Sequence, residues 1–375
     1  MAGIYIHIPF CKQACHYCDF HFSTSLKHKT AMLQALKKEL RLRKEELADE
    51  WIETIYFGGG TPSLLSLEEL QSLLDEIYRN YSVIKSPEIT LEANPDDLTN
   101  TKIRELSTIR INRLSIGIQS FFEEDLRMMN RAHSSEEAEQ CLEEVMQYFK
   151  NISVDLIYGI PGMTNERWQE NINKVLWYNI PHISCYALTV EPKTALKHLI
   201  NIGKVQPIDE VLAQQHFSIL TAKLQKSGYV HYELSNFGKE GFFSANNTAY
   251  WLGKKYMGIG PSAHSYDGNC RSWNVANNTK YIRALSEGLF SSEKEELTLT
   301  DQYNEYVMTG LRTMWGVSLN KIKNDFGVNY YQHFVKCISK YIRTELLIMN
   351  EEVITVTDKG KFLCDGIAAD LFFVD

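Results

Sequence analysis

The sequence predicts an α/β protein in which the first half forms a partial, TIM-like (β/α)6 barrel and the C-terminal part forms a mainly helical, winged-helix-like domain. The first observation is that short apolar runs alternate with longer amphipathic stretches, which is typical of parallel strands joined by right-handed crossovers. The second is that unusual residues follow several different strands. A barrel mouth collects such residues, whereas an open sheet concentrates them at one switch point.

The six predicted strands are rich in Ile, Val, Tyr and Phe, and each ends near a Gly, Pro, Asn or Cys residue. They cover residues 4–8, 54–57, 89–93, 113–118, 154–158 and 183–188. Helices are predicted where apolar residues recur at three- and four-residue spacing. These include residues 30–47, 67–81, 134–148 and 167–178. Ser66, with Glu69 three residues later, predicts a capping box at the start of the second helix.

The pattern changes after residue 188. Residues 209–227 are expected to form a long helix, and the segment 232–260 is rich in aromatic residues. The last part of the chain predicts three helices, a hairpin and a final helix, at residues 301–314, 321–326, 330–344, 347–357 and 359–370. We therefore expect a barrel over residues 1–230, an aromatic-rich extension that packs on it over 231–296, and a C-terminal domain over 297–375.

The composition excludes several classes of protein. With 39 basic and 47 acidic residues, the net charge of −8 argues against a nucleic-acid partner, even for a winged-helix-like domain. No apolar run is long enough to span a membrane. The N-terminus has no basic region followed by a long apolar stretch, so a secretory signal is not expected. We expect a cytoplasmic protein.

Three of the eight cysteines fall together in a loop directly after the first predicted strand, as Cys11, Cys15 and Cys18. The C-x3-C-x2-C spacing has no fourth cysteine nearby. Three thiolates can hold three irons of a [4Fe–4S] cluster and leave the fourth iron open to another ligand. The alternative is zinc, with His16 or His21 as the fourth ligand. The spacing favours the cluster and leaves zinc open.

Further chemistry-bearing segments follow the other strands. They read FGGGTP at residues 57–62, LEANP at 91–95, SIGIQSF at 115–121, RAH at 131–133 and DLIYGIPG at 155–162. Together with the cysteine motif, they resemble the radical S-adenosylmethionine (SAM) superfamily, in the branch of the oxygen-independent coproporphyrinogen III oxidases and the HemW heme chaperones. The resemblance covers nearly the whole chain. It implies a [4Fe–4S] cluster on the three cysteines, with SAM bound to the open iron.

The resemblance also assigns the SAM-binding residues one by one. Those that match contacts of the cluster-bound SAM are Tyr5, Gly59 and Glu92. Those that match positions around a second SAM of the oxidase are Gly60, Thr61, Gln119, Arg131 and Asp155. These residue types suit the ligand, because carboxylates accept from ribose hydroxyls and ammonium groups and an arginine can clamp a carboxylate.

Three departures separate the chain from the oxidase branch. Phe20 stands where the oxidase has a fourth cysteine. The first predicted strand begins at residue 4, whereas the oxidase has a long N-terminal extension before its first strand. Residues 243–251 resemble the HemW motif His-Asn-x-x-Tyr-Trp, although Asn246 replaces the histidine. The three positions that match are Asn247, Tyr250 and Trp251. Since asparagine is a poor axial ligand for heme iron, we expect His264 to be the first substitute.

The resemblance implies a heme chaperone that binds heme and transfers it to an acceptor protein. The alternative is an oxygen-independent coproporphyrinogen III oxidase, which performs radical oxidative decarboxylation in porphyrin biosynthesis; we do not expect that activity here. The implied partners are heme and an acceptor that the sequence does not identify. A peripheral contact with membrane respiratory proteins and a homodimer are left open, and no residue is assigned a catalytic role.

Overall fold

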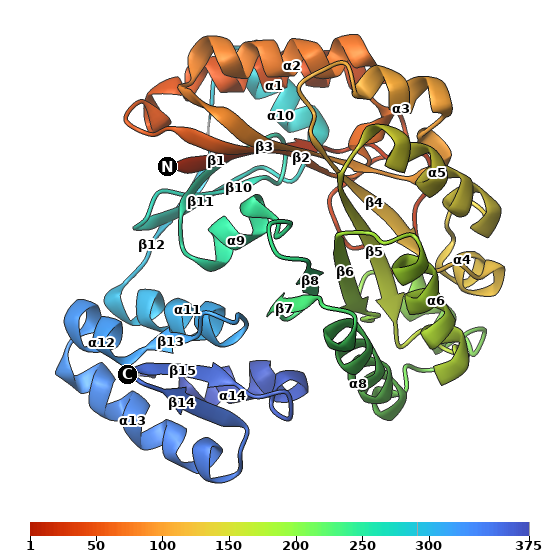
Figure 1. Ribbon diagram of the computed structural model, residues 1–375. Helices are drawn as coiled ribbons and strands as arrows, with labels where there is room; N and C mark the ends of the chain where they lie inside the picture. The colour runs from red at the N-terminus through yellow and green to blue at the C-terminus, as the bar shows by residue number, and fades with distance from the viewer. Residues whose placement is uncertain (291, 375) are drawn as a thin grey trace.

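The computed structural model describes residues 1–290 and 292–374. Its centre is a curved sheet in which six parallel strands lie side by side in chain order, as predicted (Figure 1). These strands are β1 (Ala2–Ile8), β2 (Ile52–Gly59), β3 (Val83–Ala93), β4 (Arg113–Gln119), β5 (Asn151–Tyr158) and β6 (His182–Ala187). Every residue of β4 is buried, because elements cover both faces of the sheet there. Parallel pairing brings the carboxyl ends of all six strands to one rim.

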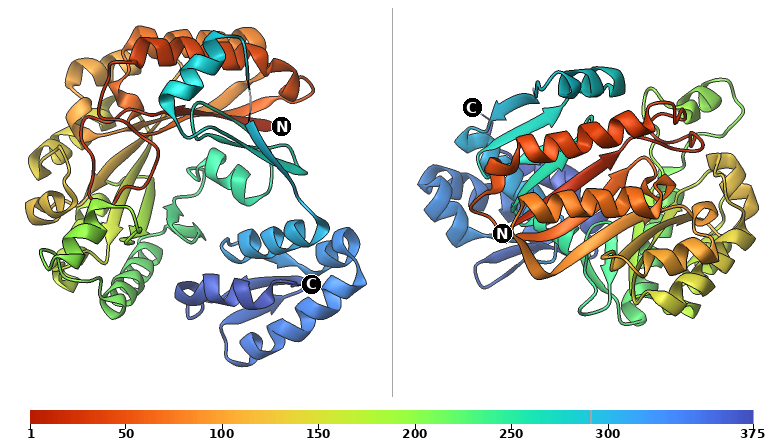
Figure 2. Two further views of the ribbon diagram at one scale, coloured as in Figure 1. Left: turned by 180° about the vertical axis from the view of Figure 1, so that it is seen from behind. Right: turned by 90° about the horizontal axis from the view of Figure 1, so that it is seen from above.

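Helices cover the outer, convex side of this sheet (Figures 1 and 2). They are α1 (Lys29–Leu42), α2 (Leu67–Asn80), α3 (Asn100–Leu106), α4 (Glu123–Met129), α5 (Ser135–Tyr148), α6 (Asn165–Trp177) and α8 (Glu210–Lys226). The short helix α7 (Ala195–Asn201) instead meets the cysteine loop, where the Leu196 peptide N–H donates to the His16 carbonyl oxygen at 2.7 Å. The capping box of Ser66 and Glu69 is confirmed. The single helix predicted over residues 30–47 is wrong. Arg43 leaves helical geometry and bonds the carbonyl oxygen of Gly258 at 2.8 Å, so α1 ends and a separate 3-10 turn follows.

The aromatic-rich extension adds strands to both edges of the sheet. Beside β6 lie β8 (Asn236–Gly238) and β7 (Val230–Glu233). Beside β1 lie β9 (Lys255–Ile259), β10 (His264–Tyr266), β11 (Cys270–Asn274) and β12 (Ser292–Glu296). Two helices complete it, α9 (Ala245–Trp251) on the concave side and α10 (Asn278–Ser286), which packs on α1 (Figure 1).

The C-terminal domain has its own hydrophobic core and forms the lower part of Figure 1. Its elements are α11 (Leu299–Leu311), β13 (Val317–Ser318), α12 (Leu319–Lys321), a π-helical turn (Ile322–Phe326), α13 (Val328–Arg343), β14 (Leu347–Asn350), β15 (Val353–Val356) and α14 (Cys364–Leu371). Leu234 packs against both cores and so joins the two domains. The domain boundaries near residues 230 and 297 stay predictions.

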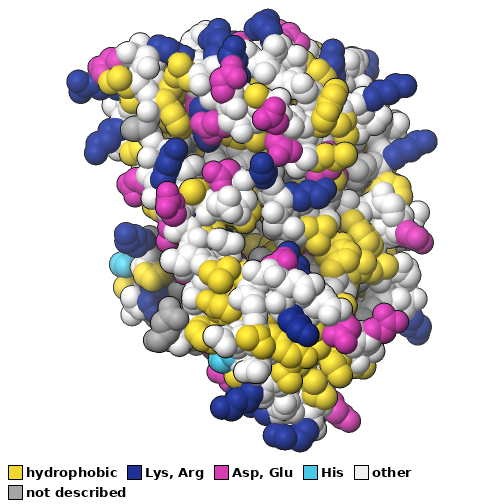
Figure 3. Space-filling model, turned by 90° about the vertical axis from the view of Figure 1, so that its left-hand side faces the viewer, with side chains coloured by type: hydrophobic (Ala, Val, Ile, Leu, Met, Phe, Trp, Pro, Cys, Tyr) yellow, Lys and Arg dark blue, Asp and Glu magenta, His cyan; other side chains and the backbone are white. Residues whose placement is uncertain are grey.

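Hydrophobic side chains gather over the part of the surface where the C-terminal domain lies, with lysine and arginine around them (Figure 3). None of the helices in the described part of the chain is both long and apolar enough to cross a membrane.

Candidate functional site

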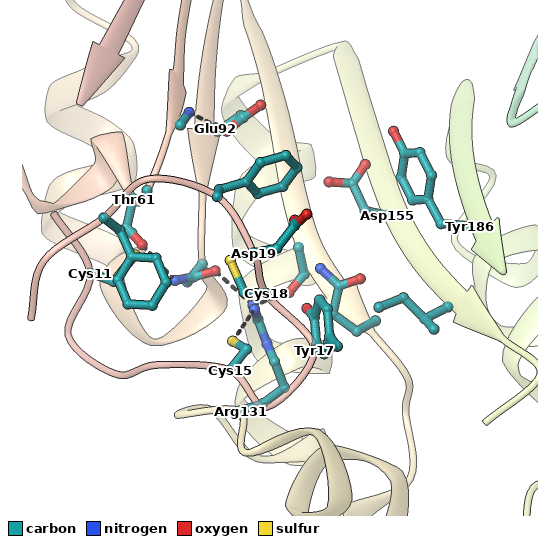
Figure 4. Close-up of a pocket in the computed structure, with 18 of the residues that line it drawn as sticks. Cys11, Cys15, Tyr17, Cys18, Asp19, Thr61, Glu92, Arg131, Asp155 and Tyr186 are labelled. Carbon is teal, nitrogen blue, oxygen red and sulfur yellow. Dashed lines mark hydrogen bonds between the residues drawn. The ribbon is translucent and has the colours of Figure 1, made fainter. Parts of the chain in front are cut away.

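The three clustered cysteines line one cavity at the carboxyl rim of the sheet, in the loop that follows β1 (Figure 4). The cavity has a volume of about 410 Å³. Seven of the predicted SAM-binding residues line it as well. They come from β2 to β5 or from the segments that follow these strands: Gly59, Gly60, Thr61, Glu92, Gln119, Arg131 and Asp155. The fold thus brings together residues up to 144 positions apart in sequence, from Cys11 to Asp155.

The cysteine loop is held in place by hydrogen bonds on both sides of the motif. Near Cys11, the Lys12 ammonium lies 2.8 Å from Asp96 and also pairs with Asp97. Further along, the His16 peptide N–H donates to the Met129 carbonyl oxygen at 3.0 Å. These contacts fix a loop that has no helix or strand of its own.

The thiols suit a cluster. All three cysteines are free and half-buried, and burial raises the pKa of Cys11 and raises that of Cys18 to about 11. The Arg131 guanidinium donates to the Cys15 sulfur at 3.4 Å (Figure 4). Metal binding would therefore release protons from Cys11 and Cys18. The two histidines considered for zinc do not line this cavity among the residues described, so the lining favours the cluster.

Glu92 is the carboxylate nearest to the glycine turn. Its Oε1 accepts from the Tyr56 hydroxyl at 2.8 Å, and its Oε2 accepts from the Gly59 peptide N–H at 3.2 Å. Burial raises its pKa to about 7, and the nearby Asp155 adds to the rise. Glu92 can therefore change its charge near neutral pH.

The glycine turn is required by packing within the protein. A Cβ on Gly58 would lie 2.9 Å from ring carbons of Tyr5 and Tyr56, and one on Gly60 would lie 2.6 Å from the Phe10 carbonyl oxygen. Gly59 has φ +108°, a conformation that L side chains rarely adopt. These glycines let the turn approach β1 and the start of the cysteine loop.

Two further residues line the cavity, one at the end of β4 and one within β5. Gln119 ends β4 with φ +67°, which is strained for a residue other than glycine. Asp155 on β5 accepts from the Ser115 hydroxyl at 3.3 Å, and burial raises its pKa to about 6. Strain at Gln119 and a buried carboxylate in the same cavity are typical of a functional site.

The Arg131 guanidinium is already engaged. Its Nη2 donates to the Asn94 side chain at 2.7 Å and to the Gly117 carbonyl oxygen at 2.8 Å, while Nη1 faces Cys15. In this structure it does not present a free fork to a carboxylate. Asn94 was missed as a site residue, although its position directly after a strand could have identified it. Tyr186, on the last barrel strand, also lines the cavity and carried no sequence signal.

Tyr5 lies outside the cysteine cavity, in a second cavity of about 500 Å³. The two cavities share four lining residues: Asp19, Phe20, Gly59 and Glu92. Tyr5 stacks on Tyr56, with ring centroids 6.0 Å apart. His264 lines this second cavity and stacks on Trp273 at 5.9 Å.

The remaining residues predicted for heme line a third and larger cavity, below α9. Asn247, Tyr250 and Trp251 all contribute to it, and Tyr250 lines the second cavity too. Asn246 is not among the residues that line this cavity. It is only 2% exposed, and its side-chain oxygen accepts from the Thr54 hydroxyl at 3.0 Å.

Comparison with protein families places both domains. Residues 5–175 match the radical SAM superfamily, and residues 297–363 match the HemN C-terminal domain. In overall fold the chain is similar to coproporphyrinogen III oxidase (HemN) from Escherichia coli, with a TM-score of 0.86 over 99% of this chain and 90% of that one. Sequence identity to that oxidase is 23%, so the likeness shows the shared fold alone.

Curated relatives are more similar in sequence. The heme chaperone HemW of Bacillus subtilis is 34% identical and that of Lactococcus lactis 33%, each over 97% of both chains. The heme chaperone HemW of Mycobacterium tuberculosis is 30% identical over 98% of this chain and 94% of its own. With matches of this extent and a cavity that gathers the three cysteines beside the glycine turn, the chain belongs to the HemW heme chaperone family of the radical SAM superfamily.

Proposed function

We propose that this chain binds heme beside its cluster loop and passes it to an acceptor protein. The observation that carries this is the second cavity, in which the His264 imidazole lies next to residues that also line the cysteine cavity. Imidazole is a common axial ligand of heme iron. The names of the curated relatives support the same ligand.

His264 is the best placed of the three histidines that line this cavity. His7 uses both ring nitrogens, since Nδ1 lies 3.3 Å from the Tyr5 hydroxyl and Nε2 lies 2.9 Å from the His21 carbonyl oxygen. His21 bonds the Asn278 side chain at 2.8 Å. In the described part of the chain, no side-chain hydrogen bond engages the His264 ring. Partial burial lowers its pKa, which favours the neutral, ligating form.

Membership of the radical SAM superfamily implies a [4Fe–4S] cluster and SAM. Cys11, Cys15 and Cys18 would hold the cluster, which supplies an electron for reductive cleavage of SAM when both are bound. We propose that Glu92 accepts hydrogen bonds from the ligand and that Gly59 lets it approach. The other predicted residues line the cysteine cavity. Tyr5 instead lines the second cavity, which shares Glu92 with the first.

A hemin titration of the cluster-loaded protein tests the proposal. We expect saturable binding with a shifted Soret band, and a weaker, spectrally different complex for His264→Ala. His28→Ala is the matched control, because His28 is exposed at the start of α1, outside the cavity. An unchanged spectrum in His264→Ala would remove His264 as the ligand. No hemin binding by the unmodified protein would overturn the proposed function.

The same preparation tests the alternative. Coproporphyrinogen III, SAM and dithionite should yield no protoporphyrinogen, and its formation would favour the oxidase. The acceptor protein, a contact with membrane respiratory proteins and a homodimer are further proposals, to be measured by heme transfer, pull-down on membranes and light scattering of the hemin-loaded protein.

A further inference from the structure

The third cavity is the largest of those described, and its lining residues come both from the strands and helix beside the barrel and from the C-terminal domain. Its volume of about 970 Å³ is at the upper end of the range for small-molecule sites. Aromatic side chains line it from both domains: Tyr250, Trp251, Tyr256 and Tyr266 on the barrel side, and Tyr306 and Trp315 on the other. Such a cavity suits a large, flat, apolar ligand.

The strand register connects this cavity to His264. In the hairpin of β10 and β11, His264 is paired with Trp273, and Tyr266 is paired with Arg271. Since alternate residues of a strand point to the same side, these four side chains share one face of the hairpin. Arg271 therefore lies about 7 Å further along the strands than His264. Tyr256, which pairs with Tyr266, lines both the second and the third cavity.

Two arginines bring positive charge to the aromatic cavity. Arg271 extends from β11, and its Nη2 lies 2.8 Å from Glu305 on α11. Arg312, just after α11, lies over the Trp251 ring at 5.4 Å and pairs with Asp365. Its Nε is buried and has no hydrogen-bond partner among the described residues. One buried donor of a residue that lines this cavity is thus left unsatisfied, which is costly unless a ligand pairs with it.

We propose that this interdomain cavity is the subsite for the ligand's carboxylates, with Arg271 as the main anchor and Arg312 beside it. The proposal rests on the proposed function, because the ligand is a porphyrin whose iron lies at His264 and whose two propionates reach past Tyr256. Arginine suits this role because its planar fork binds a carboxylate through two hydrogen bonds.

This assignment makes Glu305 a competitor of the ligand. In the structure Glu305 holds Arg271 and ties α11 of the C-terminal domain to the hairpin. A propionate at Arg271 takes the place of the Glu305 carboxylate, so ligand binding breaks one contact between the domains. Arg271→Gln and Glu305→Gln remove the same ion pair, yet only Arg271→Gln should weaken ligand binding.

The test compares hemin with hemin dimethyl ester, which lacks both carboxylates, in titrations of the full chain. We expect the unmodified protein to bind hemin more tightly than the ester. Arg271→Gln should weaken hemin binding about 10- to 100-fold, as expected for a lost charge-assisted pair, and should leave ester binding unchanged. Glu305→Gln should leave hemin binding equal or tighter. Thermal unfolding of both variants confirms that each is folded.

Other outcomes overturn the subsite and separate it from the proposed function. If both variants weaken hemin and ester alike, the ion pair only holds the domains together. Equal affinity of the unmodified protein for hemin and ester removes any carboxylate recognition. In either case heme binding itself stands. If the unmodified protein binds neither ligand, the proposed function fails, and the subsite fails with it.

Discussion

Glu92 should make SAM binding depend on pH near neutrality. Its pKa is raised to about 7, mainly by burial, with Asp155 raising it and the Tyr56 hydroxyl, the Gly59 peptide N–H and Arg113 lowering it. The ionised form is purely an acceptor at both oxygens, whereas protonation turns one of them into an O–H donor. A group with a pKa of about 7 is about nine-tenths ionised at pH 8 and about one-tenth ionised at pH 6. SAM binding should therefore weaken about tenfold over this interval, or about 1.4 kcal/mol.

The assay is calorimetric titration of SAM into the cluster-loaded protein, without oxygen, at pH 6, 7 and 8. Glu92→Gln is the control, because it keeps the size of the side chain and cannot ionise. The amino group of SAM titrates equally with both proteins, so only the difference between the two profiles reports on Glu92. The variant should bind more weakly at pH 8 and show the flatter profile.

The free energy of unfolding gives a second readout, which Glu92→Gln should raise while it weakens SAM binding. The folded state holds the Glu92 proton more tightly than the unfolded state, in which the pKa is near its ordinary value of 4.5. The stabilisation of the folded state by this bound proton is fully present below pH 4.5 and is lost as the pH rises through about 7. At pH 8, Glu92→Gln should therefore raise the free energy of unfolding, on the order of 1–3 kcal/mol. If both SAM binding and stability fall in the variant, Glu92 is a structural residue and the reasoning is wrong.

Changing Cys11, Cys15 and Cys18 together to Ser should abolish the broad absorbance near ~400 nm after anaerobic reconstitution. The melting temperature of the metal-free protein should stay nearly the same, because the loop is half-exposed. Gln119→Gly should relieve the positive φ and raise the free energy of unfolding by about 1 kcal/mol, measured with urea; a loss of stability would show that the side chain contributes more than the strain costs. Asn246→His should lower the free energy of unfolding by about 1–3 kcal/mol in the same assay, since position 246 is buried against Thr54. It should not tighten hemin binding, and a tighter complex with a changed Soret band would contradict this orientation.

The barrel could be predicted from the sequence because each strand is an apolar run with its own start and stop. Parallel pairing then places the strand ends at one rim, so the sequence alone predicts that Glu92 lies near the cysteine loop. The edges of the sheet could not be predicted in the same way. The strands β7, β8 and β10 have three or four residues each, too few to show a period of two, and they are defined by the edges on which they pair.

Within the site, sequence predicts which residues are present better than where their side chains point. The period of two places Tyr5 and His7 on the same face of β1, which the structure confirms, since both line the second cavity. This period does not predict which cavity that face of β1 lines. The hydrogen bonds of Arg131 could not be predicted from the sequence either, because its partners Asn94 and Gly117 belong to other segments of the chain.

The short helix α9 shows how a sequence motif can be divided between two faces. Its start is fixed on β3, where the carboxylate of Glu88 accepts from the peptide N–H groups of Ala245 at 3.0 Å and Asn246 at 3.1 Å. With 3.6 residues per turn, positions 246 and 250 lie on one face of α9, with Asn246 against Thr54 of β2, whereas Asn247 and Trp251 lie on the next face, over the large cavity. The motif therefore contributes aromatic surface to the ligand site while its first position packs inside the barrel. A ligand for the iron must then come from another element, and His264, on the hairpin across the second cavity, meets that requirement.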